Sequence, residues 1–118
     1  MATVLVVVLI AAAGWAVLVG LLVIQERRLI FLPSRVLAAE PSDFGLQAED
    51  LRLTAADGTR LHGWWLLGTG DRVLIWYHGN AGNIADRLDN ARLLVERLGV
   101  DIVLVDYRGY GRSGGTPD

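Results

Sequence analysis

The first two dozen residues form an apolar run that limits what the chain can become. No charged residue occurs between Ala2 and Gln25, and positions 3–24 are almost continuously Val, Leu, Ile, Ala, Gly and Trp. As an α-helix this run is about 33 Å long, which matches the hydrocarbon core of a bilayer. A buried core helix rarely runs that far without one polar residue. The run therefore predicts a membrane-spanning anchor over residues 1–25, with the lipid bilayer as its partner.

A cleaved signal peptide is the main alternative to an anchor. Signal peptides begin with basic residues and have a shorter apolar stretch that ends at small residues. Here the N-terminus carries no Lys or Arg, and the run leads directly into Gln25-Glu26-Arg27-Arg28. An uncleaved, single-pass anchor is therefore the favoured interpretation. Arg27, Arg28 and Arg35 all follow the span, so the positive-inside rule places the rest of the chain in the cytoplasm.

The composition argues against metal, disulfide and nucleic-acid chemistry. The chain has no cysteine, and its two histidines, His62 and His78, have no carboxylates at a recognisable metal-ligand spacing. The formal net charge is −2 and no basic patch recurs, so nucleic acid is not an expected partner. We therefore expect neither a cofactor nor a metal ion.

A linker and a hairpin are predicted after the anchor. Residues 26–48 contain two prolines and mixed polar and apolar residues, which is typical of a linker, and they lead to a domain over residues 49–118. The turn Ala55-Ala56-Asp57-Gly58 separates two partly alternating apolar runs at 51–54 and 59–67. Asp-Gly between such runs indicates a β-hairpin, because glycine takes positive φ there without strain.

A strand–helix–strand unit follows the hairpin. Residues 73–77 and 100–105 are apolar on both faces, as expected of strands buried inside a sheet. Residues 83–98 repeat apolar side chains with a helical period, with Asn83 as N-cap and Gly99 where a left-handed C-terminal glycine belongs. The chain is therefore predicted to be an N-terminal transmembrane helix followed by an α/β domain with parallel strands.

Two loops follow the carboxyl ends of these strands, which is where open α/β sheets place their sites. The first, His78-Gly79-Asn80-Ala81-Gly82-Asn83, joins a strand to a helix N-terminus. The first amides of that helix are expected to point unpaired into the crevice and to bind an anion. The anion could be a phosphate or the oxyanion of a tetrahedral intermediate. On spacing alone, a plain strand-to-helix turn is the alternative.

The second loop, residues 106–115, contains two known motifs in an unsuitable context. Gly111-Arg112-Ser113-Gly114-Gly115 matches the G-x-S-x-G nucleophile elbow, which requires a strand directly before it and a helix directly after it. Five residues separate this motif from the preceding strand. Its glycines also match a dinucleotide fingerprint, which again requires a helix that the sequence does not indicate. We therefore expect Ser113 not to be a nucleophile, and keep an active hydrolase that uses Ser113 as an alternative.

Taken in order, these motifs resemble the α/β-hydrolase superfamily. His-Gly-Asn-Ala-Gly-Asn, a helix, and an apolar strand that leads into Asp-Tyr-Arg-Gly-Tyr-Gly-Arg-Ser-Gly-Gly are most similar to membrane-anchored serine hydrolases with serine-aminopeptidase-like or lysophospholipase-like domains. The resemblance covers about Leu51 to Asp118. It implies acyl transfer from a small ester, thioester, amide or lipid-like substrate.

The resemblance also implies roles for particular residues. The backbone N–H of Asn80, with Ala81 beside it, corresponds to the family's oxyanion hole, and His78 corresponds to a residue that braces the loop. The family's nucleophile, acid and base lie further along than Asp118. We therefore expect the N-terminal portion of a hydrolase that is inactive alone. In the family's sheet the strand at 73–77 is central, so one of its edges is expected to be unpaired here.

Two alternatives remain open on the sequence alone. The natural gene product could be longer and could form a complete membrane-anchored hydrolase. The chain could instead be a small membrane-anchored interaction module that pairs the open edge of its half-sheet with a partner.

Overall fold

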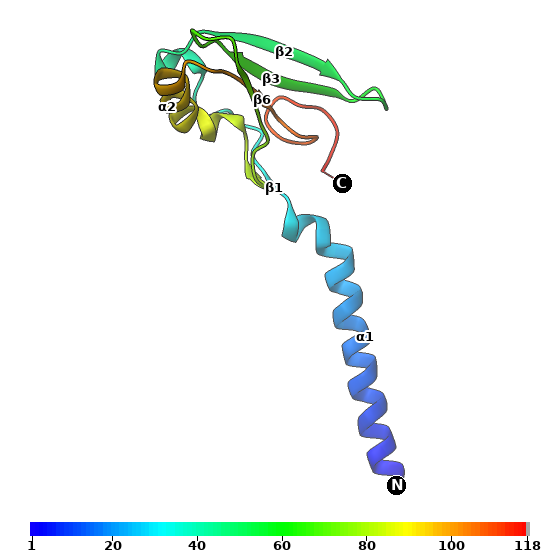
Figure 1. Cartoon of the computed structure of the whole chain (residues 1–118). Helices are drawn as coiled ribbons and strands as arrows, with labels where there is room; N and C mark the ends of the chain where they lie inside the picture. Colours follow the sequence, from blue (N-terminus) through cyan, green and yellow to red (C-terminus); the bar gives the residue numbers. More distant parts are fainter. Residues whose placement is uncertain (118) are drawn as a thin grey trace. The chain divides into compact units, whose positions relative to one another are not determined.

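The N-terminal unit is a single helix. The computed structural model describes residues 1–117, and α1 covers Ala2–Ile30 (Figure 1). Its length and composition are sufficient to cross a membrane, and none of its residues is buried. An apolar helix at this position is of the kind that serves as a membrane anchor or a signal sequence.

The helix ends later than the apolar run. Residues 26–30, expected to belong to a linker, are helical. Arg27 and Arg28 lie in the last turn of α1, where cations interact favourably with the negative end of the helix dipole. Pro33, the first proline of the chain, follows soon after the end of α1, and a helix does not tolerate proline in its interior.

The remainder of the expected linker belongs to the second compact unit, which begins at Phe31. It contains the two-residue strand β1 (Leu32–Pro33) and the 3₁₀ turn η1 (Pro41–Phe44). Leu46 is buried in the core of this unit. Elements this short leave no periodic pattern in a sequence, so residues 31–48 are part of the domain although their composition resembles a linker.

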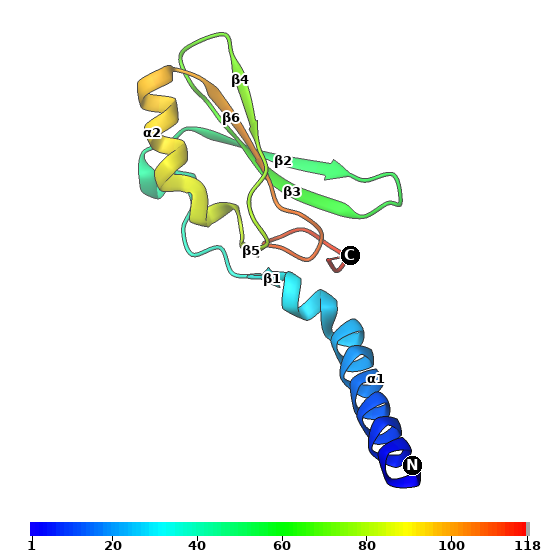
Figure 2. The ribbon, with the colours of Figure 1, turned by 60° about the horizontal axis from the view of Figure 1, so that its bottom comes forward.

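A four-stranded sheet in the order β2-β3-β6-β4 forms the centre of the second unit (Figure 2). β2 (Ala48–Thr54) and β3 (Arg60–Leu66) form an antiparallel hairpin. β6 (Asp101–Val105) pairs antiparallel with β3 and parallel with β4 (Val73–Trp76). The predicted hairpin and the predicted parallel strands joined by a helix are both confirmed.

The crossover helix ends at the predicted residue, whereas the first turn of the predicted helix, after Asn83, is a 3₁₀ turn. A 3₁₀ turn, η2 (Ile84–Arg87), leads directly into α2 (Leu88–Leu98). The side chain of Asn83 accepts a hydrogen bond from the N–H of Ala85 at the start, and Gly99 takes φ +64° at the end. Helix and sheet enclose one apolar core, whose most buried members are Trp64, Leu66, Ile84, Leu88, Ala91, Ile102 and Leu104.

The apolar sequence of β4 predicts a strand buried inside the sheet, but β4 is not buried. It is an edge strand with β6 as its one neighbour. Val73, Leu74 and Ile75 are 53%, 39% and 57% exposed, so both faces of the strand are open. An apolar pattern indicates that a strand can be buried on both faces, whereas its actual burial depends on which elements pack against it. The unpaired N–H and C=O groups along this edge can pair with another strand.

Truncating a core side chain tests this packing. Leu104 on β6 is fully buried, whereas Leu93 on α2 is 40% exposed. We expect Leu104→Ala to lower the free energy of unfolding by about 2–5 kcal/mol, because the change removes buried apolar contacts and leaves a cavity. Leu93→Ala, the same chemical change at the surface, is expected to cost less than about 1 kcal/mol. Urea unfolding followed by tryptophan fluorescence measures both, and equal losses would contradict the described core.

Candidate functional site

The loop between β4 and α2 is tied to the segment that follows α1. Within this loop the short strand β5 (Ala81–Gly82) pairs in parallel with β1. The N–H of Leu32 donates to the carbonyl of Asn80 (2.8 Å), and the side-chain amide of Asn83 donates to the carbonyl of Ser34 (3.2 Å). Residues that are far apart in the sequence therefore hold this loop from outside.

The first amides of the crossover helix are not free to bind an anion. The N–H of Ile84 donates to Asp106 Oδ1, that of Ala85 to Asn83 Oδ1, and that of Asn83 to Asp86 Oδ2, each at 3.0 Å. The expectation that these amides point unpaired into the crevice is thus wrong. Carboxylate and amide oxygens of the protein itself occupy the positions that an external anion would take.

The backbone amide of Asn80, which lies earlier in the same loop, differs from these amides in its hydrogen bonding. Asn80 is exposed, and within residues 1–117 its backbone N–H donates to no acceptor. Its carbonyl is held from two sides, by the N–H of Leu32 and by the hydroxyl of Tyr110 (2.7 Å). Ala81, the next residue, is exposed and begins β5. A fixed, unpaired N–H at the surface is the type of donor that oxyanion holes use.

His78 lies beneath this loop and is 4% exposed. Its Nδ1 donates to the carbonyl of Gly79 (2.8 Å), since a carbonyl can only accept. Its Nε2 lies 3.4 Å from Asp106 Oδ1. Both ring nitrogens thus face oxygen atoms of the protein. The hydroxyl of Tyr107 donates to the His78 carbonyl (2.8 Å), so side chain and main chain are both fixed.

Asp106 is the centre of a buried polar cluster with His78 and His62, which we call the Asp106 cluster. Asp106 is fully buried, and its Oδ2 lies 4.0 Å from His62 Nδ1. Burial by itself raises the pKa of this carboxyl, but the nearby His62 and His78 rings and the hydrogen bond from the N–H of Ile84 outweigh burial and hold the pKa below 3.8. Within residues 1–117 no group of side chains is arranged to hold a metal ion.

Ser113 lies next to the Asp106 cluster, but its hydroxyl forms hydrogen bonds only with main-chain atoms of the cluster residues. Its Oγ is buried, donates to the Asp106 carbonyl (2.7 Å) and accepts from the N–H of His62 (2.9 Å). A nucleophilic serine needs an accessible oxygen and a histidine ring that takes its proton. The Ser113 hydroxyl has neither, and it serves here to join β3 to the loop after β6.

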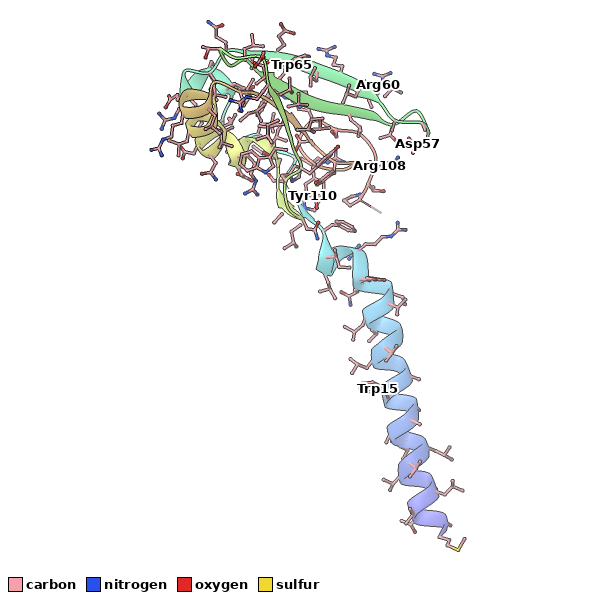
Figure 3. All side chains as sticks on the ribbon, viewed as in Figure 1. Trp15, Asp57, Arg60, Trp65, Arg108 and Tyr110 are labelled. Atoms are coloured by element: carbon pink, nitrogen blue, oxygen red, sulfur yellow. The ribbon has the colours of Figure 1, made fainter. Side chains whose placement is uncertain are left out.

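A cleft of about 360 Å³ opens beside the Asn80 loop. Among the described residues that line it, Arg108 carries the charge, and it forms an ion pair with Asp57 at the hairpin turn (Figure 3). Tyr110, also labelled in Figure 3, is 1% exposed and connects the cleft to the loop through its hydroxyl. The residues that line the cleft are Phe31, Leu61, Asn80, Tyr107, Arg108, Tyr110 and Pro117.

The sequence patterns single out His78, Asn80, Ala81 and Ser113, and the structure brings the first three together in one loop. They did not single out Asp106, Tyr107 and Tyr110 as the groups that hold this loop. The one available signal was an acidic residue directly after an apolar strand, Asp106, which is costly to bury without partners.

None of the protein-family models matches the chain. The chain is 34% identical over 107 residues to the α/β-hydrolase domain-containing protein WAV2 of Arabidopsis thaliana, covering 84% of this chain and 35% of that protein. It is 32% identical over 88 residues to protein bem46 of Schizosaccharomyces pombe, covering 71% and 29%. The chain thus spans about a third of the length of these curated relatives.

Solved structures with the same fold include an esterase. The esterase Pf2001 of Pyrococcus furiosus superimposes with a TM-score of 0.62 at 27% sequence identity. The match covers 74% of this chain and 35% of the esterase.

Replacing Asp106 tests the role of its carboxylate. At pH 7 we expect Asp106→Asn to lower the free energy of unfolding by about 1–3 kcal/mol, because buried partners lose an ionised acceptor. The folded pKa lies below 3.8, so the stabilisation is complete above that value and is lost as the pH falls through the folded pKa. The difference in free energy of unfolding between the wild type and Asp106→Asn therefore becomes smaller in acid. Urea midpoints between pH 7 and pH 2 measure this, with the exposed Asp71→Asn as control; a constant difference would contradict it.

Proposed function

The chain belongs to the α/β-hydrolase superfamily, and from this premise we propose that it supplies the oxyanion-hole loop of a membrane-anchored serine hydrolase. The observation that carries the proposal is the exposed, unpaired N–H of Asn80, whose carbonyl is held by Leu32 and Tyr110. In acyl transfer, negative charge develops on the substrate's carbonyl oxygen. A donor fixed in advance stabilises that charge without reorganising during the reaction.

The catalytic nucleophile is proposed to come from polypeptide outside these 118 residues. Ser113 is buried and hydrogen-bonded to main-chain atoms. The nearest acids to the two histidine rings are Asp106 for His78 (3.4 Å) and Asp50 for His62 (3.3 Å), so neither ring meets a serine hydroxyl. Ser34 and Ser42 are the other serines of the chain, and neither has a histidine among its hydrogen-bond partners in the described residues. The chain alone is therefore proposed to be inactive toward esters, thioesters and amides.

The apolar helix is proposed to anchor this loop to the membrane, with the second unit on the cytoplasmic side. Residues 3–24 have the length and apolarity of a bilayer span. Arg27 and Arg28 lie in the last turn of α1. Basic residues on this side of the span support a cytoplasmic second unit by the positive-inside rule.

The open edge of β4 favours a second candidate function, strand pairing with a partner. Val73, Leu74 and Ile75 are exposed apolar residues on a strand with one neighbour. A strand from another polypeptide could add main-chain hydrogen bonds along this edge and cover the apolar side chains. This role is compatible with the first, because the polypeptide that supplies the nucleophile could also supply the strand.

A fluorophosphonate probe tests for a reactive serine in the chain itself. We expect no labelling of the purified chain, because the Ser113 hydroxyl is buried and lacks a base. We expect Ser113→Ala to lower the free energy of unfolding by about 1–3 kcal/mol, since two buried hydrogen bonds are lost. Labelling of the wild type that disappears in Ser113→Ala would make Ser113 the nucleophile and overturn the proposal.

A chimera tests the Asn80 amide directly. Residues 31–117 would replace the matching third of the Pyrococcus furiosus esterase, which supplies the rest of the fold. In this chimera we expect Asn80→Pro, which removes the backbone N–H, to lower kcat about 10²–10³-fold. Asn80→Ala keeps that N–H and is the matched control, expected to retain activity. Equal activity of the two variants would show that the Asn80 amide does not stabilise the oxyanion.

A further inference from the structure

A second cavity, of about 530 Å³, opens over the hairpin of β2 and β3. Arg52 on β2, Arg60 on β3 and Arg112 in the loop after β6 all line it. Figure 3 shows Arg60 on the other side of the hairpin from Arg108, the arginine that is paired with Asp57. Three of the eleven basic residues of the chain thus line one cavity, although the formal net charge of the chain is −2.

The strand register holds two of these arginines near each other. Arg52 lies opposite His62 and Thr54 lies opposite Arg60, so these four side chains leave the same face of the hairpin. Arg52 and Arg60 are therefore diagonal neighbours, which are about 7–8 Å apart in an antiparallel pair and within reach of each other's long side chains. Two like charges at this separation repel, and an anion bound between them relieves the repulsion.

The donors of these arginines are largely unused. Within residues 1–117, the guanidinium groups of Arg52 and Arg60 form neither an ion pair nor a hydrogen bond. Arg112 is paired with Glu40, but a guanidinium carries several N–H donors, and the pair occupies one nitrogen. The cavity therefore presents guanidinium donors that come from two neighbouring strands and one loop.

The one carboxylate that lines the cavity is already engaged. Asp50 Oδ1 lies 3.3 Å from His62 Nε2, and His62, at 8% exposure, is the most buried of the lining residues. Asp50 and Glu40 bring two negative charges to the three arginines, so one positive charge is left in excess. The excess charge favours an anionic ligand.

We propose that this cavity binds a phosphate dianion, as the free ion or as the phosphate group of a small monoester, through Arg52, Arg60 and Arg112. The planar guanidinium fork matches the oxygen geometry of phosphate and can bind it bidentately. A phosphate group has three terminal oxygens, so two arginines can bind it at once, whereas a single guanidinium fork satisfies both oxygens of a carboxylate. The hydroxyl of Thr54, opposite Arg60, is a further donor.

The rest of the cavity suits a short organic substituent on the phosphate. Its volume of about 530 Å³ lies within the range of sites for small organic molecules. Leu53 and Leu61 also line it and contribute apolar surface, whose burial against the substituent would add to binding. The site does not depend on the proposed hydrolase activity, because it needs neither the Asn80 amide nor a nucleophile.

Calorimetric titration of the full chain in a non-ionic detergent tests this site. Inorganic phosphate and glycerol 3-phosphate would be titrated separately at about pH 8, where both are dianions. Saturable binding of either supports the proposal: tighter binding of glycerol 3-phosphate identifies the monoester as the ligand, and equal binding identifies the free ion as sufficient. Binding of neither would overturn the proposal.

Arginine variants separate a built site from general charge attraction. We expect Arg52→Gln and Arg60→Gln each to raise the Kd for the anion about tenfold, because each loses a charge-assisted contact. Arg97→Gln removes the same charge from the last turn of α2, outside the cavity, and is expected to leave the Kd unchanged. All three side chains are exposed, and circular dichroism checks that each variant is folded. An equal Kd in all four proteins, or equal weakening in all three variants, would overturn the proposal.

Acetate tests the preference for phosphate over a carboxylate. It carries one charge and two oxygens, so we expect it to bind at least about tenfold more weakly than inorganic phosphate. Equal affinity for acetate and phosphate would show a general anion site and overturn the assignment to phosphate. No step of the experiment requires hydrolysis, so its result and that of the Asn80 chimera are independent.

Discussion

The buried carboxylate of Asp106 connects the parts of the second unit that matter for function. It accepts from the Ile84 N–H at the start of the crossover helix, faces the His78 ring beneath the Asn80 loop, and approaches the His62 ring on β3. A buried carboxylate without such partners would be strongly unfavourable. Gly111, at φ +45°, has no room for a Cβ because Asp106 Oδ2 occupies that space. Helix start, candidate oxyanion loop and the loop after β6 are therefore positioned together.

A second set of bonds holds the same loops from the side of the chain that follows α1. The Arg35 guanidinium donates to the carbonyls of Ser113 and Gly115, and the N–H of Gly111 donates to the carbonyl of Ser34 (2.8 Å). The Asn80 loop is bonded to the same segment through β1. Nearly all these acceptors are main-chain carbonyls, whose positions are set by the fold.

Local chemistry made much of this fold predictable, and tertiary context explains the rest. Asp57-Gly58 marked the hairpin, and Asn83 and Gly99 marked the helix ends, because turn and cap preferences act within a few residues. The engagement of the Ile84 amide was not predictable in this way, because its acceptor comes from Asp106, twenty-two residues away. The exposure of β4 depends on which strands flank it, and that is a property of the whole sheet. The loop that contains His78 was predicted from the strand and helix patterns, whereas the bracing role of His78 came only from family resemblance, since one histidine in a turn has no distinctive pattern.

The pairing of β1 with β5 has a practical consequence for anyone who wants the domain without its helix. A soluble version that started at β2 would discard Leu32, Ser34 and Arg35, and with them the bonds that hold both loops. The boundary suited to protein engineering lies between Ile30 and Phe31, where the two compact units meet along the chain. A protease that cut a few residues later would separate the domain from α1 and, by the same cut, loosen the candidate site.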